Sequence, residues 1–347
     1  MKYISKLFLV VLSISLFIAC EKADNLIDNN EVQKKAKDFK NQPPGLDQER
    51  FVTMKAKDFA YLNVDLKIHY RIIGKGPIDM VWIPGWTNPI TVFTKQFDYF
   101  KDKARSIYID LPGHGLSDTF IPSTYPVPAA YEPDGEDCKF VPVDYPEPDS
   151  EGMHYTMEMM ADAMYTVLKK EGVHKFTAVG FSWGPKVLGK FEKTYPGMIQ
   201  KLVAIDGGFK PGVSELENFC EYMGQYQWTE GFKAFLANYL GGVYSGLEPD
   251  PELLELLQYF VEFPSIILAD MNYQATKNEN NVPVGWMYPK LCFYANPTPN
   301  MDKVNLFYPN NTVYTFPGGG HVIHWLFADE INPLIADFVK DRPGNKY

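Results

Sequence analysis

The distribution of apolar residues predicts alternating strands and helices from about residue 51 onward. Four short apolar runs, IDMVWIPG, SIYIDLPG, FTAVG and KLVAIDGG, each end at Gly or Pro. Such runs are typical of strands buried on both faces of a parallel sheet. An earlier stretch, AYLNVDLKIHYRIIG, combines β-branched and aromatic residues with a polar break and predicts an antiparallel hairpin.

The clearest predicted helix is MEMMADAMYTVLKKEG, in which apolar residues recur at helical spacing and two lysines and a glycine mark the end. We interpret its methionines as core packing rather than a cofactor site. Strands that alternate with helices predict an α/β fold with a mostly parallel, doubly wound sheet, and ligands bind such a sheet beyond the carboxyl ends of its strands. The apolar positions of this helix are Met157, Met160, Ala161, Met164 and Leu168.

Two segments interrupt this alternation. Residues 119–151 are rich in Pro and acids and too long for an ordinary connection, which indicates either a loop packed near the site or a partly disordered excursion. Residues 211–285 are helix-rich and aromatic and would suit a cap over the strand ends, inserted after the sixth strand. Residues 51–210 and 286–347 then form the two parts of the core.

The first 19 residues have the pattern of an export signal. Lys2 and Lys6 precede an apolar run, Leu7 to Ala19, that is too short and wrongly flanked for a spanning helix. The sequence FIAC at its end resembles a bacterial lipoprotein signal, which implies lipidation of Cys20 and anchoring at the bacterial cell envelope. Plain secretion, or a soluble periplasmic location, is the alternative. The polar residues 20–50 would then be a flexible spacer.

Charge and cysteine content narrow the function further. The net charge of -10, without clustered Lys and Arg, argues against a nucleic-acid partner. Cys138, Cys220 and Cys292 are scattered without metal-ligand spacing, so no metal site is expected. They are either three thiols or one disulfide, such as Cys138 with Cys220, and a free thiol.

A candidate nucleophile is Ser182 in AVGFSWGPKV. Gly180 and Gly184 flank it in a G-x-S-x-G pattern, a predicted strand precedes it, and a predicted helix follows, which together permit a sharp turn that exposes the hydroxyl. Three further motifs occur: IPGW at 83–86, DLPGHGLSD at 110–118 and GGGHVIHWLFADEINPLIADFV at 318–339. With these four motifs in order over residues 51–340, the chain resembles the α/β-hydrolase fold family.

A serine hydroxyl needs a base to become a nucleophile. The resemblance implies that His321, in the glycine-rich loop after NTVYTF, is that base. His324, three residues later, is interpreted as a packing residue at a helix start, and His114 in the DLPGHG turn as structural.

Two aspartates are candidates for the acid that orients the histidine. Many family members carry it after the seventh strand, but the matching position here, near Thr298, has no carboxylate. Asp302 lies several residues later. Other members carry the acid after the sixth strand, where this chain has Asp206 in KLVAIDGG, and we favour Asp206 over Asp302. The resemblance also implies that the backbone N–H groups of Trp86 and Trp183 form an oxyanion hole.

The function predicted from these residues is hydrolysis of a small-molecule carboxylic ester through an acyl-enzyme, with no metal or organic cofactor. A proline-iminopeptidase-like aminopeptidase acting on an amide is one alternative, although IPGWTNP lacks the HGGPG of those enzymes. Acids in the predicted cap could bind its substrate amine, and a non-catalytic ligand-binding homologue is the second alternative. The cap acids are Glu215, Glu217, Glu221 and Glu262.

Overall fold

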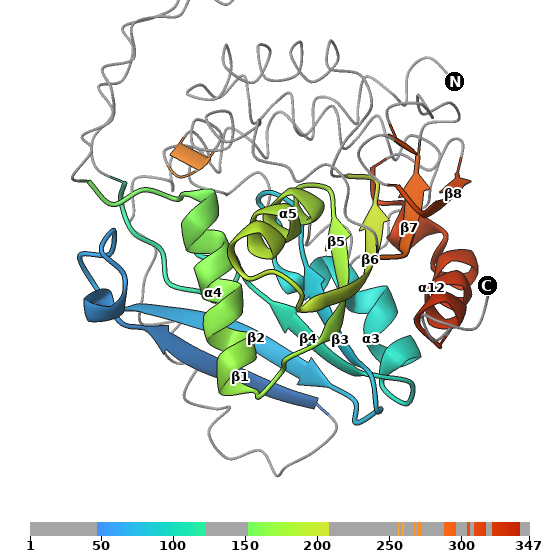
Figure 1. Cartoon of the computed structure of the whole chain (residues 1–347), viewed down its shortest axis with the longest axis horizontal. Coiled ribbons are helices and arrows are strands. Elements are labelled where there is room, and N and C mark those ends of the chain that lie inside the picture. The colour runs from blue at the N-terminus through green and yellow to red at the C-terminus, as the bar shows by residue number, and fades with distance from the viewer. Residues whose placement is uncertain are drawn as a thin grey trace, which may run out of the picture. The chain divides into compact units, whose positions relative to one another are not determined.

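The structure is a computed structural model that describes residues 47–122, 152–207, 288–295, 309–316 and 321–340, together with positions 256, 259, 267, 270, 271, 304 and 305. These residues contain one eight-stranded sheet (Figure 1). Its strands are β1 (Asp47–Met54), β2 (Leu66–Ile73), β3 (Asp79–Ile83), β4 (Arg105–Ile109), β5 (Phe176–Phe181), β6 (Ile199–Ile205), β7 (Lys290–Tyr294) and β8 (Asn311–Thr315).

The sheet is antiparallel at one edge and parallel elsewhere. Its order is β1-β2-β4-β3-β5-β6-β7-β8, in which β2 pairs antiparallel with both β1 and β4. All remaining neighbours are parallel. The four apolar runs of the sequence correspond to β3, β4, β5 and β6, so the predicted α/β class with a mostly parallel sheet is confirmed.

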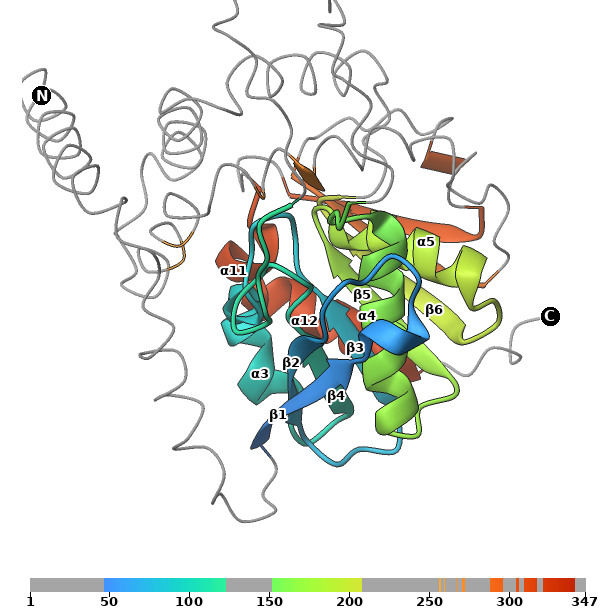
Figure 2. The same cartoon turned by 90° about the vertical axis from the view of Figure 1, so that its left-hand side faces the viewer.

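Helices cover both faces of the sheet. Figure 2 shows α4 (Met157–Lys170) and α5 (Gly184–Thr194) on one side, and α3 (Thr94–Phe100), α11 (Ile323–Leu326) and α12 (Ala328–Lys340) on the other. Successive side chains of a strand point to opposite faces. Val81 and Ile83 of β3 therefore belong to the core beneath α4 and α5, whereas Met80 and Trp82 belong to the core beneath α3 and α12.

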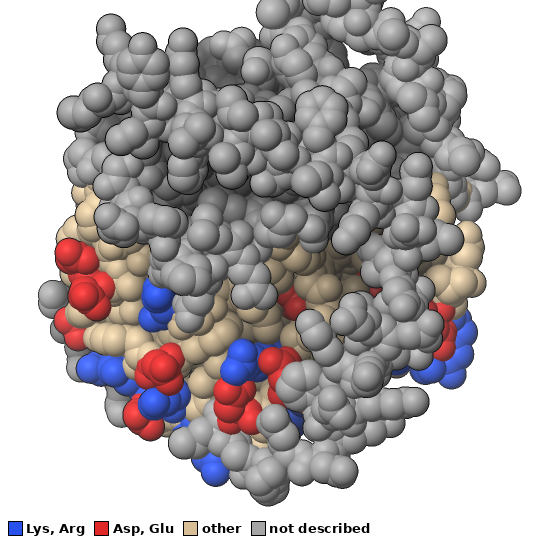
Figure 3. Space-filling view, turned by 180° about the vertical axis from the view of Figure 1, so that it is seen from behind, with Lys and Arg blue, Asp and Glu red and all other residues tan. Residues whose placement is uncertain are grey.

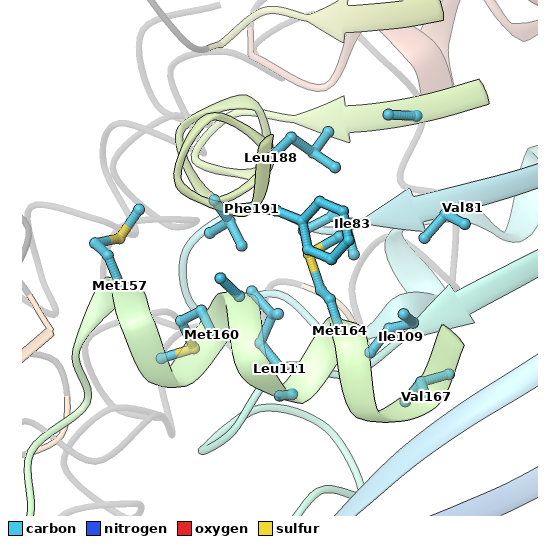
Figure 4. Close-up of a cluster of buried hydrophobic side chains, with 14 of the residues drawn as sticks. Val81, Ile83, Ile109, Leu111, Met157, Met160, Met164, Val167, Leu188 and Phe191 are labelled. Carbon is cyan, nitrogen blue, oxygen red and sulfur yellow. The ribbon is translucent and has the colours of Figure 1, made fainter. Parts of the chain in front are cut away.

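Helix α4 illustrates how the sequence produces these layers. Thr156 caps its first turn by accepting the backbone N–H of Met159 at 3.1 Å, and Gly172 follows its end with a φ of +66°. The predicted apolar positions are buried, and Met160 and Met164 lie in the cluster drawn in Figure 4. Burying one such side chain contributes roughly 1.5–3 kcal/mol.

The N-terminal edge differs from the sequence prediction. The strand that pairs with β2 at the outer edge of the sheet is β1, Asp47–Met54, and not a strand within residues 60–65. The core therefore begins at Asp47 rather than at residue 51, within the segment that we expected to be spacer. Between the two strands lies the short 3-10 helix η2, Ala56–Asp58.

Other sequence predictions fall on residues that the structure does not describe. These are the signal segment, nearly all of the spacer, most of the 119–151 insert and most of the 211–285 cap. Cys20, Cys138 and Cys220 lie there too, whereas Cys292 is a buried free thiol in β7. None of the described helices has the length and apolar character that crossing a membrane requires. On the face in Figure 3, the described acidic and basic side chains are interspersed.

Candidate active site

A strand-turn-helix unit holds Ser182. Strand β5 ends at Phe181 and α5 begins at Gly184, so the chain reverses within two residues. Ser182 has a φ of +54°, a strained value for a residue other than glycine. A Cβ atom on Gly184 would lie 2.4 Å from the backbone oxygen of Ile83, which explains the second glycine of the motif. The turn therefore presents the serine beyond the carboxyl end of β5.

Two further polar side chains meet Ser182 at this edge of the sheet. Asp206 directly follows β6, and His321 precedes α11. The Nε2 atom of His321 lies 2.7 Å from Ser182 Oγ, and its Nδ1 atom lies 2.6 Å from Asp206 Oδ2. Because an ionised carboxylate only accepts hydrogen bonds, Nδ1 is the donor and Nε2 accepts the hydrogen bond of the serine hydroxyl. The structure thus brings three residues predicted from the sequence into one hydrogen-bonded chain.

The carboxylate of Asp206 is fixed from several directions. Its side chain is almost completely buried, and Oδ1 accepts the backbone N–H of Ala295 at 3.0 Å. Its own backbone N–H donates to the carbonyl of Phe293 in β7 at 2.7 Å. The φ of Asp206 is +40°, which short polar residues such as Asp and Asn tolerate best. Asp302, the alternative acid, lies outside the described residues.

The two neighbouring histidines, His321 and His324, differ in burial and in their hydrogen-bond partners. The ring of Phe181 contacts both His321 and His324, with ring centroids 4.9 and 4.4 Å away. His324 is fully buried in α11, and its Nε2 atom donates to the carbonyl of Val92 at 3.0 Å. Burial lowers the pKa of His324 to about 3, so it is neutral and acts as a packing residue.

The loop after β3 passes close to the serine. A Cβ atom on Gly85 would lie 2.8 Å from the Cβ atom of Ser182, so only glycine allows this approach. Trp86 follows it, and Trp183 follows Ser182. Within the described part of the chain, neither tryptophan backbone N–H donates to another group. Among the described residues, no group competes for these two amides with an acceptor beside the serine.

Sequence reasoning gave no role to Asp110, although it begins the DLPGHGLSD motif directly after β4. This buried carboxylate accepts backbone N–H groups from Ile90 at 2.8 Å and from Leu116 at 3.0 Å, and it lies 2.6 Å from His69 Nδ1. A Cβ atom on Gly115 would lie 2.2 Å from a carboxyl oxygen of Asp110. Asp110 therefore connects the motif to the loop that carries Trp86.

No cluster of His, Cys, Asp or Glu that could hold a metal ion occurs among the described residues. The cap acids proposed for binding a substrate amine, Glu215, Glu217, Glu221 and Glu262, are outside them. The chemistry that the described arrangement offers is proton transfer from a serine hydroxyl to an imidazole beside two backbone amides.

Comparison with known proteins gives one family and many solved structures. The sequence model for the alpha/beta hydrolase fold matches residues 80–283. No curated protein matches the sequence. Wild-type Cfl2 from Burkholderia cenocepacia is 15% identical, covering 86% of this chain and 99% of its own, with a TM-score of 0.60. A malate-bound thermophilic esterase from Thermogutta terrifontis is 17% identical, covering 84% and 98%, with a TM-score of 0.58. The epoxide hydrolase CorEH is 13% identical, covering 84% and 98%, with a TM-score of 0.59.

Proposed function

Because the chain belongs to the alpha/beta hydrolase fold family, we propose that it is a serine hydrolase that cleaves carboxylic esters through an acyl-enzyme. The observation that carries this proposal is the hydrogen-bonded chain from Ser182 through His321 to Asp206, with 2.7 and 2.6 Å between the bonded atoms. The roles of these three residues follow from the chemistry of their atoms.

In the first half-reaction, Ser182 Oγ attacks the ester carbonyl carbon while His321 Nε2 takes the hydroxyl proton. The imidazole becomes positively charged, and the buried carboxylate of Asp206 stabilises that charge through Nδ1. The tetrahedral intermediate then expels the alcohol, which receives the proton from Nε2. The product of this step is an ester between the substrate acyl group and Ser182.

The negative oxygen of the tetrahedral intermediate needs hydrogen-bond donors. The backbone N–H groups of Trp86 and Trp183 suit this role, because both residues lie beside Ser182 and neither amide is used within the described residues. Removing one such donor in other enzymes costs about 2.7–4 kcal/mol of transition-state stabilisation.

In the second half-reaction, water takes the place of the alcohol. His321 Nε2 accepts a proton from the water as it attacks the acyl carbonyl, and returns that proton to Ser182 Oγ when the acid leaves. Each proton taken up is released again, so this sequence of steps needs neither a metal nor an organic cofactor.

A serine nucleophile also argues against epoxide opening, the activity in the name of one structural relative. An alkoxide that opened an epoxide would form an ether with Ser182, and an ether has no carbonyl that water could attack. The enzyme would not turn over. Ester and amide substrates both give the same hydrolysable acyl-enzyme, so the aminopeptidase alternative must be separated by experiment.

The test combines a fluorophosphonate probe with two chromogenic substrates. We expect the probe to label the wild type and not S182A, and p-nitrophenyl acetate to be cleaved much faster than proline β-naphthylamide. Faster cleavage of the amide would favour the aminopeptidase. A well-folded wild type that neither reacts with the probe nor cleaves either substrate would favour the non-catalytic ligand-binding homologue.

The proposal extends to where the protein acts. Residues 1–19 and the FIAC sequence support export followed by lipidation of Cys20, which would anchor the enzyme at the bacterial cell envelope. The polar residues that follow Cys20 would separate the catalytic core from the membrane surface.

A further inference from the structure

The turn after β4 carries a second buried histidine that the proposed mechanism does not use. His114 is completely buried, and its ring lies beside the indole of Trp183, with 6.3 Å between ring centroids and 22° between ring planes. Trp183 directly follows the candidate nucleophile. His114 therefore packs against the residue that follows Ser182.

Hydrogen bonds fix the tautomer of His114. Its Nδ1 atom lies 3.0 Å from the carbonyl oxygen of Pro112, and a carbonyl only accepts, so Nδ1 carries the proton. Its Nε2 atom is then an acceptor, and it receives the backbone N–H of Thr87 at 3.1 Å. Burial lowers the pKa of His114 to about 4, which keeps the imidazole neutral and able to accept at neutral pH.

The residue that His114 holds is strained and adjoins a proposed oxyanion donor. Thr87 directly follows Trp86 and has a φ of +62°, a strained conformation for a β-branched residue. Three residues later, the N–H of Ile90 donates to Asp110. Two residues of the DLPGHG turn, His114 and Asp110, thus accept hydrogen bonds from backbone amides of the loop after β3, one on each side of Asn88.

We propose that His114 is a positioning residue for the oxyanion hole: by accepting the N–H of Thr87, it holds the adjacent Trp86 amide where the oxyanion forms. This inference rests on the proposed function, because it concerns the transition state of the same reaction. In this role His114 acts through the backbone of Thr87 and Trp86 and not on the reacting atoms.

The test compares H114M, which removes the acceptor while keeping similar bulk, with H114Q, whose amide oxygen can accept the Thr87 N–H. We expect H114M to lose about 10-fold to 100-fold in kcat, a fraction of the effect of losing a whole oxyanion donor, with KM nearly unchanged. H114Q should recover most of the loss. Affinity for a trifluoromethyl ketone, which forms an oxyanion on Ser182, should fall by the same factor as kcat in H114M.

A merely structural histidine would lower the melting temperature of both variants without this pattern. The inference alone is overturned if wild type hydrolyses esters and folded H114M keeps its kcat and its trifluoromethyl ketone affinity. A wild type without turnover or probe labelling overturns the proposed function instead.

If H114M fails to fold, nitrogen-15 NMR of the histidine rings in the wild type tests the hydrogen bond from Thr87 to His114 on which the inference depends. A neutral ring protonated at Nδ1 supports the inference, and a ring protonated at Nε2, or charged at neutral pH, overturns it.

Discussion

Replacing Asp206 by Asn tests how the imidazole is oriented. The amide has nearly the same shape as the carboxylate, and Asn tolerates the φ of +40° at this position, so the fold should survive. In D206N, the amide oxygen can still accept the Ala295 N–H, as Oδ1 does now at 3.0 Å. The amide NH₂ group then faces His321 Nδ1 and forces that atom to accept.

The consequence follows at the opposite side of the ring. With Nδ1 unprotonated, the neutral imidazole carries its proton on Nε2, which points at Ser182 Oγ and can no longer take the serine proton. The negative charge that stabilises the imidazolium is also lost. The equivalent change in a serine protease lowers kcat about 10⁴-fold, or about 5 kcal/mol of barrier, and we expect a loss of about 10³-fold to 10⁴-fold here.

The assay is steady-state hydrolysis of p-nitrophenyl acetate by wild type, D206N and D302N. Thermal melts establish that each variant is folded. We expect D302N to keep near wild-type kcat, since the described geometry gives the carboxylate at Nδ1 to Asp206. A kcat near that of the wild type in D206N, together with a strongly reduced kcat in D302N, would refute the reasoning.

Three further predictions concern stability, turn geometry and anchoring. Burial lowers the pKa of His69, but this effect is outweighed by hydrogen bonds and charges from Asp110 and Glu49, which raise the pKa to about 9. Because this pKa exceeds the unfolded value near 6.5, the stabilisation is complete below pH about 6.5 and disappears as the pH rises through 9. Urea titrations at several pH values should show that the free energy of unfolding of the wild type falls by up to about 3 kcal/mol over that window, and that of H69Q does not. The same dependence of the unfolding free energy on pH in both proteins would contradict this prediction. In G207A the new Cβ would lie 1.9 Å from the Ser182 backbone oxygen, so kcat should fall together with about 1–3 kcal/mol of stability, whereas G172A, with open space around its Cβ, should keep its kcat. Intact-mass analysis after expression in bacteria should find a diacylated or triacylated Cys20, and C20S should leave the membrane fraction; an unmodified soluble wild-type chain would end the lipoprotein proposal.

The sequence predicted the central strands well for a physical reason. Strands buried on both faces consist almost entirely of apolar residues, so β3 to β6 appear as short runs that end at Gly or Pro. The edge strand β1 has no such signature, because an edge exposes part of its surface and carries charges. Its first four residues, DQER, therefore looked like the end of a polar spacer, and the pairing of β1 with β2 was missed.

The residues of the candidate site could be predicted from the sequence, but the contacts that position them could not. Motifs singled out Ser182 and His321, and the position after the sixth strand singled out Asp206. The contact of Thr87 with His114 joins loops 27 residues apart and needs a positive φ that nothing in a Trp-Thr-Asn sequence indicates. The close approach of Gly207 to Ser182 likewise depends on how β5 and β6 pair.

The central claim is that Ser182 Oγ carries the acyl group during turnover. The most direct measurement is mass spectrometry of enzyme quenched in acid during hydrolysis of p-nitrophenyl acetate, with S182A in parallel. We predict one acetyl group on the peptide that contains Ser182, and no turnover by S182A. Acetylation at another residue, or undiminished turnover by S182A, would contradict the account.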